Sequence, residues 1–331
     1  MIDSVAPLLA ARHPALTWNV RHDLVGIELD PRELWELPRV RQAQRTQNAD
    51  GSWSYHGGSA AIRPREDYGQ LATYQQLLVL VSQYRLDRRH PVLERAAESV
   101  LSFQKPEGDI RGIYGQQFTP NYTADLLRLL IEAGYAADAR VLAGMRWLLS
   151  ARQDDGGWAV PARTAGSRPL TETLSLPRPL EPDRSKPSSH LITGIVLRAF
   201  AAHPALRRRP EVRQAAILLT SRFFKPDAYP DRRGADYWMK LAFPFRWTDI
   251  VSALDAVGLI GLESDRPDVA RGLRRVRESQ LSSGLWRCGY PNSPDPLADH
   301  WVTFAAARML RRFRLVPGDG VAPRVEVARV R

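Results

Sequence analysis

Three short stretches of this chain share one pattern: a glutamine, a short polar turn, a glycine and a tryptophan. They occupy residues 47–53, 153–158 and 280–286. The last two each end a segment whose apolar residues recur at helical spacing. A punctuation that is repeated along a chain indicates one supersecondary unit used several times. The repeat therefore constrains the architecture before any other feature does.

Two weakened copies of the pattern lie between the complete ones. Residues 103–108 keep Gln104, with Ile110 near the position of the tryptophan, and residues 223–227 keep only Phe-Phe-Lys-Pro-Asp. With these two, five copies punctuate the chain.

The segments on either side of each copy differ in polarity. Before a copy, apolar residues form one stripe, as in residues 141–149, which is typical of a helix exposed on one side. After a copy comes a segment that is apolar or small nearly all round, as in residues 71–81, 191–202, 250–260 and 302–310. A helix without a polar face is surrounded by protein. The sequence therefore predicts an all-α fold in two concentric layers, with the buried helices inside.

One more helix pair is expected at the N-terminus, over residues 16–25, where Gly26 stops the helix, and over residues 31–45. About six helix pairs result, which is enough to close a ring. We expect a single α/α toroid over residues 1–315. A Pro-rich insertion without a helical stripe, at 161–189, is either disordered or a lid. Residues 316–331 form an appended tail, whose residues 321–330 alternate as a strand does.

The overall composition limits the classes of function. The chain has 331 residues, a formal net charge of +11 and one cysteine, Cys288. No apolar run approaches the roughly 20 residues of a membrane span and no secretory signal is visible, so we expect a cytoplasmic protein. The arginines are spread along the chain without a nucleic-acid-binding motif, so no nucleic-acid partner is expected. Peripheral membrane contact and the oligomeric state stay open.

The Gln-x(2–5)-Gly-x-Trp punctuation at the end of an outer helix resembles the QW motif of the terpenoid cyclase and protein prenyltransferase superfamily. Through repetition, the resemblance covers residues 39–312. It implies an α/α toroid of inner and outer helices. It also implies that the glutamine and the tryptophan of each motif tie outer helices to neighbouring turns and take no part in catalysis. The motif is specific for the fold and only suggestive of function.

In that superfamily the cavity is lined by the first turns of the inner helices, and the matching positions here are unusually polar. Helix capping accounts for many of the acidic, amide and hydroxyl side chains, but not for the basic and aromatic ones. Six helix starts of this mixed kind predict one convergent pocket. The residues expected to line it are Trp18, Arg21, Tyr68, Asn121, Tyr122, Asp125, His190, Arg246, Trp247, Asp249, Asp299, His300 and Trp301.

A cyclase of this kind needs one strong general acid and aromatic faces that stabilise a migrating cation. The acid of the family lies in an Asp-x-Asp-Asp motif that this chain lacks, and the nearest positional match is Asp249. Asp249 is therefore the candidate acid, although Arg246 beside it is expected to lower its pKa. His190 and His300 are the candidate bases. The expected cation-stabilising walls are Trp18, Tyr68, Tyr122, Trp247 and Trp301.

Two further expectations concern ligands. Arg21 and Arg246 would hold an anionic head group of an isoprenoid substrate. A zinc site from Cys288, Asp299 and His300 is geometrically conceivable, but a small hydrophobic role in packing is favoured for Cys288. No cofactor is expected.

The favoured function is cyclase-like or prenyl-handling chemistry on an isoprenoid in the central cavity, and two other classes stay open. An α/α-barrel lyase or glycoside hydrolase on an acidic sugar would use two facing carboxylates, or arginine and histidine against a uronate. A non-catalytic helical ring would bind a lipid or a partner. Aromatic walls with one buried acid favour isoprenoid chemistry, and paired carboxylates in an open cleft favour sugar chemistry.

Overall fold

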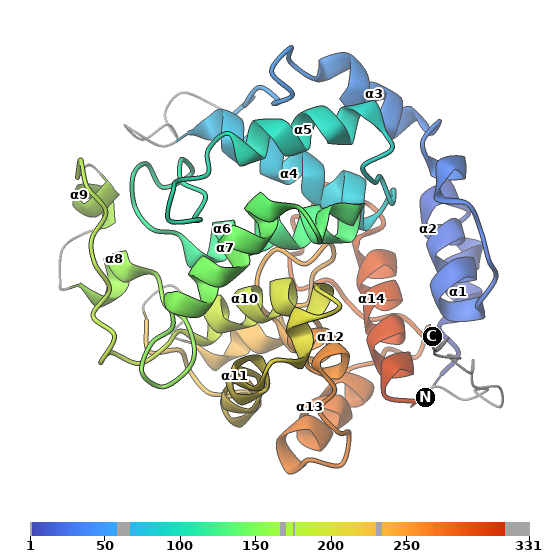
Figure 1. Cartoon of the computed structure of the whole chain (residues 1–331). Coiled ribbons are helices and arrows are strands. Elements are labelled where there is room, and N and C mark those ends of the chain that lie inside the picture. The colour runs from blue at the N-terminus through green and yellow to red at the C-terminus, as the bar shows by residue number, and fades with distance from the viewer. Residues whose placement is uncertain (1, 58–66, 166–169, 175, 230–233, 315–331) are drawn as a thin grey trace, which may run out of the picture.

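The computed structural model describes residues 2–57, 67–165, 170–174, 176–229 and 234–314 (Figure 1). Within these ranges the chain forms fourteen α-helices and no β-strand, with isolated bridges inside turns as the only β-type pairing. The expected all-α class is confirmed. No helix in these ranges combines the length and the hydrophobicity of a membrane span. The predicted tail at 316–331 lies outside the described residues.

The apolar segments that follow the repeated turns form helices that are buried on all sides. All eleven residues of α6 are buried, and so is every residue of α10 except Ala202. A helix without a polar face must be surrounded by protein, so these helices form the interior. They are α4 (Tyr68–Ser82), α6 (Pro120–Leu130), α10 (His190–Ala202), α12 (Ile250–Ile260) and α14 (Ala298–Arg312).

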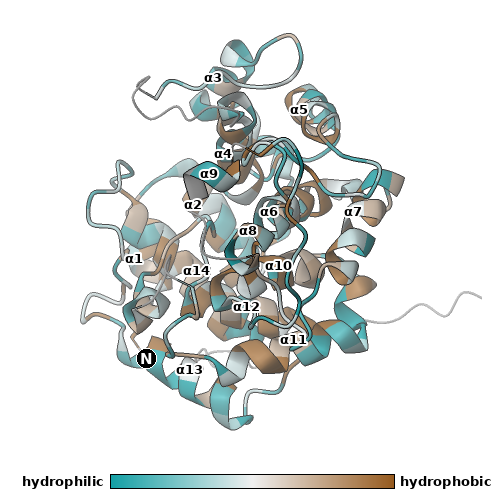
Figure 2. Ribbon diagram, turned by 90° about the vertical axis from the view of Figure 1, so that its left-hand side faces the viewer, coloured by the Kyte–Doolittle hydropathy of each residue, from teal (hydrophilic) through white to brown (hydrophobic). Residues whose placement is uncertain are grey.

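The striped segments form helices that bury one face only. In α13 the buried residues are Val269, Gly272, Leu273 and Val276, which share one side of the helix. Figure 2 shows the hydrophilic residues of α13 on the outer edge of the molecule. Proline opens four of the five helices, where its missing N–H and fixed φ suit the first helical position. The five are α3 (Pro38–Thr46), α5 (Pro91–Leu101), α7 (Ala139–Ser150), α11 (Pro210–Ser221) and α13 (Pro267–Glu278).

The N-terminal region is partly as expected. The helix predicted over residues 16–25 is present as α2 (Pro14–Asn19) and its π-helical continuation η1 (Val20–Val25), and it ends at Gly26 with a φ of 88°. Glycine adopts that left-handed conformation without steric cost. A short helix, α1 (Val5–Ala10), precedes it.

Two expectations about helices are wrong. Residues 31–45 do not form one helix, because Pro38 cannot continue a helix from the turn before it. A 3-10 turn, η2 (Pro31–Leu34), therefore precedes α3. The insertion at 161–189 is not free of helix, since α8 (Pro161–Thr164) and α9 (Leu170–Leu174) lie in it. The remaining short turns are η4 (Ile131–Tyr135), η5 (Leu206–Arg208) and η7 (Ala235–Met239).

The inner helices pack against one another in chain order. Contacts link α4 to α6, α6 to α10, α10 to α12, α12 to α14, and α14 to η1. Next to η1, Nδ2 of Asn19 donates a hydrogen bond to the carbonyl of Gln83, just past α4, at 2.8 Å. The N-terminal helices α1 and α2 with η1 therefore lie beside the last inner helix, α14, as the blue and red ribbons in Figure 1 show.

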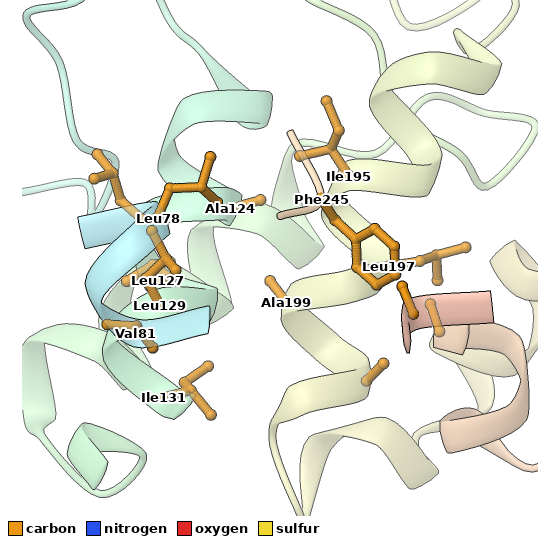
Figure 3. Packing of buried hydrophobic residues seen from close by; sticks show 14 of the residues in the cluster. Leu78, Val81, Ala124, Leu127, Leu129, Ile131, Ile195, Leu197, Ala199 and Phe245 are labelled. Atoms are coloured by element: carbon orange, nitrogen blue, oxygen red, sulfur yellow. The ribbon is translucent and has the colours of Figure 1, made fainter. Parts of the chain in front are cut away.

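A single hydrophobic core spans these helices. In Figure 3, Leu78 of α4 and Leu127 of α6 point into the cluster from one side, and Ile195 of α10 does so from another. Phe245 joins the same cluster from the segment between η7 and α12. This segment, residues 240–249, therefore enters the interior instead of crossing the surface.

Each complete repeat turn fastens the end of an outer helix. The tryptophan indole N–H donates to a backbone carbonyl ten residues earlier, in the last turn of that helix, and satisfies one of its orphan carbonyls. The three bonds are Trp53 to Ala43 at 2.9 Å, Trp158 to Leu148 at 2.6 Å and Trp286 to Val276 at 2.7 Å. The backbone N–H of each tryptophan donates to a threonine of the next inner helix, namely Thr73, Thr193 and Thr303.

The glutamine of the repeat turns reaches across to neighbouring chain. Nε2 of Gln47 donates to the carbonyl of Val92 in α5, and Nε2 of Gln104 donates to that of Arg140 in α7, each at 2.8 Å. In the last copy, Gln280 donates to the carbonyl of Ile2 at 2.9 Å and so holds the N-terminal segment. These bonds confirm the structural role that the resemblance implies for the glutamines and tryptophans.

Candidate active site

A cavity of about 450 Å³ lies between the carboxyl-terminal halves of the inner helices. Its wall includes Val81 at the end of α4, Ala201 at the end of α10 and Leu259 at the end of α12, and the segment before α12 adds Phe243 and Phe245. The expected pocket was at the opposite, amino-terminal ends of the same helices.

Six arginines dominate the wall of this cavity: Arg85, Arg128, Arg198, Arg207, Arg308 and Arg312. Four of them belong to the carboxyl-terminal halves of inner helices, where the partial negative charge of the helix end favours cations. Three carboxylates share the wall, those of Asp87, Glu132 and Asp255. Positive charge therefore prevails around the cavity.

Two carboxylates hold the arginines of α14. Asp255 accepts a hydrogen bond from Nε of Arg312 at 2.6 Å, and Arg308 lies 3.6 Å from both Asp255 and Asp23. Asp23 also pairs with Arg85 at 2.5 Å. Burial opposes ionisation of Asp23, but the charges of Arg85 and Arg308 hold its pKa below the ordinary value. Asp23 thus stays ionised and links η1 to the wall.

Asp125 organises the other side of the wall. Its carboxylate accepts hydrogen bonds from Nε of Arg128 at 2.7 Å and from the hydroxyl of Tyr74 at 2.6 Å, and Arg198 lies 3.5 Å away. Burial opposes ionisation, yet the charges of Arg128 and Arg198 lower the pKa of Asp125. Arg198 also donates to the carbonyl of Phe245 at 3.4 Å, which ties the segment before α12 to α6 and α10.

Several guanidinium N–H groups of the wall lack an acceptor. Nη2 of Arg128, Nε of Arg198 and Nε of Arg308 are buried and have no hydrogen-bond partner in the described structure. The side chain of Arg207 makes no hydrogen bond or ion pair with any described residue. A buried donor without an acceptor costs about 1–3 kcal/mol. Among these groups, the Arg207 guanidinium is the one that lines the cavity and has hydrogen-bonding capacity that the described residues do not fill.

Aromatic faces lie next to these cations. The ring of Trp18 stacks on His22 with centroids 4.8 Å apart, and the guanidinium of Arg85 lies 5.9 Å from the Trp18 ring. Phe243 stacks on Trp301 at 5.9 Å, and the guanidinium of Arg308 lies 5.6 Å from the Phe243 ring. The cavity thus combines apolar and aromatic surface with a charged wall.

Asp249, the candidate acid, caps α12 and does not line the cavity. Its carboxylate accepts from the N–H of Ser252 at 2.8 Å and from the N–H of Ala242 at 3.1 Å, and the Ser252 hydroxyl completes a capping box. Burial raises the pKa of Asp249 to about 6, against the opposing effects of these hydrogen bonds and of Arg198. The expected lowering of this pKa is wrong, because burial outweighs the opposing effects, and the arginine whose charge opposes burial is Arg198, not Arg246.

The two candidate bases lie at helix starts and away from the cavity wall. His190 opens α10 and is buried against Trp238, with ring centroids 6.3 Å apart. Burial lowers the pKa of His190, which favours a neutral imidazole. His300 lies in the first turn of α14. Nδ1 of each histidine has no hydrogen-bond partner among the described residues.

Some of the predicted residues meet around Tyr74. The ring of Tyr122 packs edge-on against Tyr74 with centroids 5.6 Å apart, and Asp125 accepts the Tyr74 hydroxyl. Asn121, which precedes Tyr122 in the sequence, is buried, and its Oδ1 has no hydrogen-bond partner in the described structure. Arg198, which pairs with Asp125, donates a hydrogen bond from Nη2 to the carbonyl of Arg246 at 3.3 Å and so connects this group to Arg246.

The other predicted residues fall into separate groups. Tyr68 packs on Tyr55 at 4.9 Å, and the guanidinium of Arg246 lies 5.5 Å from the ring of Trp247. Arg21 is exposed. Of the thirteen residues expected to share a pocket, Trp18 alone lines the cavity, and Trp301 lies behind Phe243.

The zinc candidate is wrong. The backbone N–H of Cys288 donates to the carboxylate of Asp299 at 2.7 Å, so the two residues meet without metal-binding geometry. Throughout the described ranges, no three His, Cys, Asp or Glu side chains are grouped so that they could hold a metal ion. Burial raises the pKa of the Cys288 thiol, which favours the neutral, packing form.

The charged wall was not among the features predicted from the sequence, although the sequence carries a signal for it. Arg198 in α10 and Asp255 in α12 are each the single Asp, Glu, Lys or Arg of an inner helix that is otherwise almost entirely apolar or small. Charged residues are almost never fully buried unless they are paired. Each lone charge therefore predicts an ion pair between neighbouring inner helices or a bound ligand.

Comparisons with known proteins add little. No protein-family model matches the chain, and no curated protein matches its sequence. Among solved structures, the type II terpene cyclase MstE from Scytonema is similar with a TM-score of 0.33 and 12% identity, over 84% of this chain and 97% of MstE.

Two further solved structures are similar at the same low level. A complex of a MstE variant with its substrate, geranylgeranyl dihydroxybenzoate, gives a TM-score of 0.34 and 12% identity, over 84% of this chain and 96% of that one. A protein from Actinoplanes gives 0.29 and 14% identity, over 86% of this chain and 100% of that one. TM-scores this low carry no argument about function.

Proposed function

We propose that this chain is an isoprenoid-handling enzyme whose substrate occupies the cavity inside a closed α/α toroid. The contacts that run from α4 through α6, α10, α12 and α14 to η1 support closure of the inner ring. The hydrogen bond from Asn19 to Gln83 returns to the end of α4, where the ring begins. The outer helices then form the second layer.

The proposal rests on one observation: the segment that walls the cavity with aromatic rings also ends in a single buried acid. Phe243 and Phe245 line the cavity, and Asp249 follows them with a pKa of about 6. Protonation of an alkene needs a carboxyl group that is still partly protonated near neutral pH. The resulting cation is stabilised by aromatic faces. We therefore keep Asp249 as the proposed acid.

The remaining roles follow from where the side chains lie. Trp18 on the wall and Trp301 behind Phe243 are proposed as cation-stabilising groups. His190 and His300 lie away from the cavity wall, so their roles as bases stay predictions and form no part of this proposal. Cation stabilisation by Tyr68, Tyr122 and Trp247, and head-group binding by Arg21 and Arg246, stay predictions.

The substitution Asp249→Asn tests the acid. Asparagine caps a helix about as well as aspartate does, so its oxygen can keep the bond from the N–H of Ser252 while the exchangeable proton is lost. The N–H of Ala242 loses its acceptor, which costs about 1–3 kcal/mol, so circular dichroism checks that the variant is folded. Wild-type protein is incubated with farnesyl diphosphate, geranylgeranyl diphosphate and squalene, and the extracted products are identified by gas chromatography and mass spectrometry. We expect turnover by the wild type and a loss of roughly 100-fold or more in the variant.

A matched control is Asp236→Asn, which removes an exposed carboxylate paired with Lys240 and should leave turnover unchanged. A wild-type rate for Asp249→Asn would remove the acid assignment. Absence of turnover of every isoprenoid by the wild-type protein would overturn the proposed activity.

The arginine-rich wall favours one alternative, an enzyme that acts on an acidic sugar. A uronate carboxylate suits the guanidinium group, and Glu132 and Asp255 also lie on the wall. An oligouronate in the same assay separates the two functions, because a lyase would release an unsaturated sugar that absorbs ultraviolet light. An isoprenoid that binds without being converted would indicate a non-catalytic ring.

A further inference from the structure

We propose that the arginine wall of the cavity binds a phosphate or diphosphate group. The charge balance of the wall is the first argument. Besides the three carboxylates on the wall, Asp23 and Asp125 lie behind it, paired with wall arginines. One of the three, Asp87, is already paired at 2.5 Å with Arg89, which is not part of the wall. Six arginines therefore face four remaining carboxylates, which leaves excess positive charge suited to a multiply charged anion.

The incomplete pairing of the arginines is the second argument. Arg128 and Arg198 are each 4% exposed, and each retains a buried N–H without an acceptor, as does Arg308. The Arg207 side chain has no hydrogen-bond or ion-pair partner among the described residues, although it lines the cavity. Structural ion pairs need no such surplus of donors, because a buried donor is normally satisfied. The three buried N–H groups have almost no accessible surface, so the donors that an oxyanion can reach are those of the Arg207 guanidinium and the exposed faces of the other wall arginines.

The number of separate elements that contribute is the third argument, and it favours a phosphate over a carboxylate. Arg85 follows α4, Arg207 lies in η5, and Arg308 and Arg312 belong to α14. A carboxylate offers two oxygens, a phosphate monoester offers three strong acceptors, and a diphosphate offers more. Arginine is also the side chain best suited to bidentate recognition of phosphate.

The backbone conformation and the contacts of Arg85 also indicate that its side chain is fixed in place at the cavity wall. Arg85 adopts a left-handed conformation with a φ of 53°, which residues other than glycine rarely adopt. Its side chain is held by Asn19, which accepts from Nε at 2.7 Å, and by Asp23. Non-glycine residues in this region cluster at ligand-binding and active sites.

The phosphate could belong to an isoprenoid diphosphate or to a free phosphate compound. The inference rests on the proposed function only for the apolar part of the ligand, since the anion site is defined by the arginines alone. Inorganic diphosphate as a probe therefore tests the anion site, and farnesyl diphosphate tests the apolar part.

The experiment is isothermal titration calorimetry at constant ionic strength on the full chain. Its probes are inorganic diphosphate, inorganic phosphate, farnesyl diphosphate and glucuronate, and its variants are Arg207→Glu and the matched Arg208→Glu. Arg208 is exposed and adjacent to Arg207, but it does not line the cavity. Because the Arg207 side chain has no hydrogen-bond or ion-pair partner in the described structure, its substitution should leave the fold intact. Circular dichroism checks this.

We expect inorganic diphosphate to bind, with roughly tenfold or greater weakening by Arg207→Glu and little change by Arg208→Glu. No binding of either phosphate probe at millimolar concentration, equal effects of the two variants, or tighter binding of glucuronate than of diphosphate would each overturn the inference. Farnesyl diphosphate that binds no more tightly than inorganic diphosphate would leave the anion site standing and count against the isoprenoid function.

Discussion

Two buried carboxyl groups in this chain are stabilised in opposite ways. Asp125 is surrounded by Arg128 and Arg198, whose charges outweigh burial and lower its pKa. Asp249 is hydrogen-bonded mainly by backbone N–H groups, and burial raises its pKa to about 6. The first carboxyl is therefore a fixed negative charge, and the second carries an exchangeable proton near neutral pH.

Asp249 should make the protein less stable as the pH rises from about 4 to about 6. The pKa of this group is 3.8 when unperturbed and about 6 in the folded chain. Between these values the folded state binds more protons than the unfolded state does. The stability that this provides is complete below pH 3.8 and is lost as the pH rises through 6.

The raised pKa of Asp249 corresponds to a change in the free energy of unfolding on the order of 3 kcal/mol. Urea unfolding of the wild type and of Asp249→Asn from pH 4 to pH 7 measures it, because other groups cancel in the difference. As the pH rises from 4 to 7, the free energy of unfolding of Asp249→Asn relative to that of the wild type should increase by about 3 kcal/mol. A difference that is independent of pH would show that the folded-state pKa is not raised.

The repeat turns act on whole helices. Each tryptophan satisfies a carbonyl at the end of one outer helix, and its own backbone N–H is bonded to a threonine of the next inner helix. One residue thus fixes the end of an outer helix against the start of an inner one. The weakened second copy keeps the threonine bond, from Ile110 to Thr123 at 3.1 Å, and loses the indole.

The substitution Trp158→Phe should destabilise the protein by about 2–4 kcal/mol, because it leaves the Leu148 carbonyl without its donor and creates a small cavity. A matched control is Trp18→Phe, which replaces another buried tryptophan whose indole N–H has no partner among the described residues. Denaturant unfolding should show a loss for Trp158→Phe that is larger by about 1–3 kcal/mol. Equal losses would contradict a fastening role for the indole.

Across the molecule, specific contacts join the N-terminal segment to distant parts of the chain. Gln280 donates to the carbonyl of Ile2 and accepts from its N–H, and Asn19 links α2 to the end of α4. The cavity lies inside the helices that these contacts connect. Its charged wall draws on residues as far apart in the sequence as Arg85 and Arg312.

Much of the fold could be predicted because its determinants are local. The glutamine and tryptophan turns, the apolar stripes and the stop at Gly26 act over a few residues, and each appears in the structure as expected. Pro38 carries an equally local signal, and it explains why the expected helix at 31–45 is divided.

The site could not be predicted to the same degree because it depends on which helix ends meet. Polar residues at helix starts, such as Asp249 with its capping box, are explained by capping alone. The pairing of Asp125 with Arg198 joins two helices far apart in the sequence, and only packing shows it. The sequence does carry one signal of the site: Arg198 and Asp255 are single charges in apolar helices, and both line the cavity.

The most direct test of the account is a crystal structure of the full chain with farnesyl diphosphate. We predict that the diphosphate lies against Arg85, Arg207 and Arg308, and that the isoprenoid chain extends along Trp18 and Phe243. A ligand bound outside this cavity, away from these arginines, would contradict the proposal that the arginine-walled cavity is the functional site.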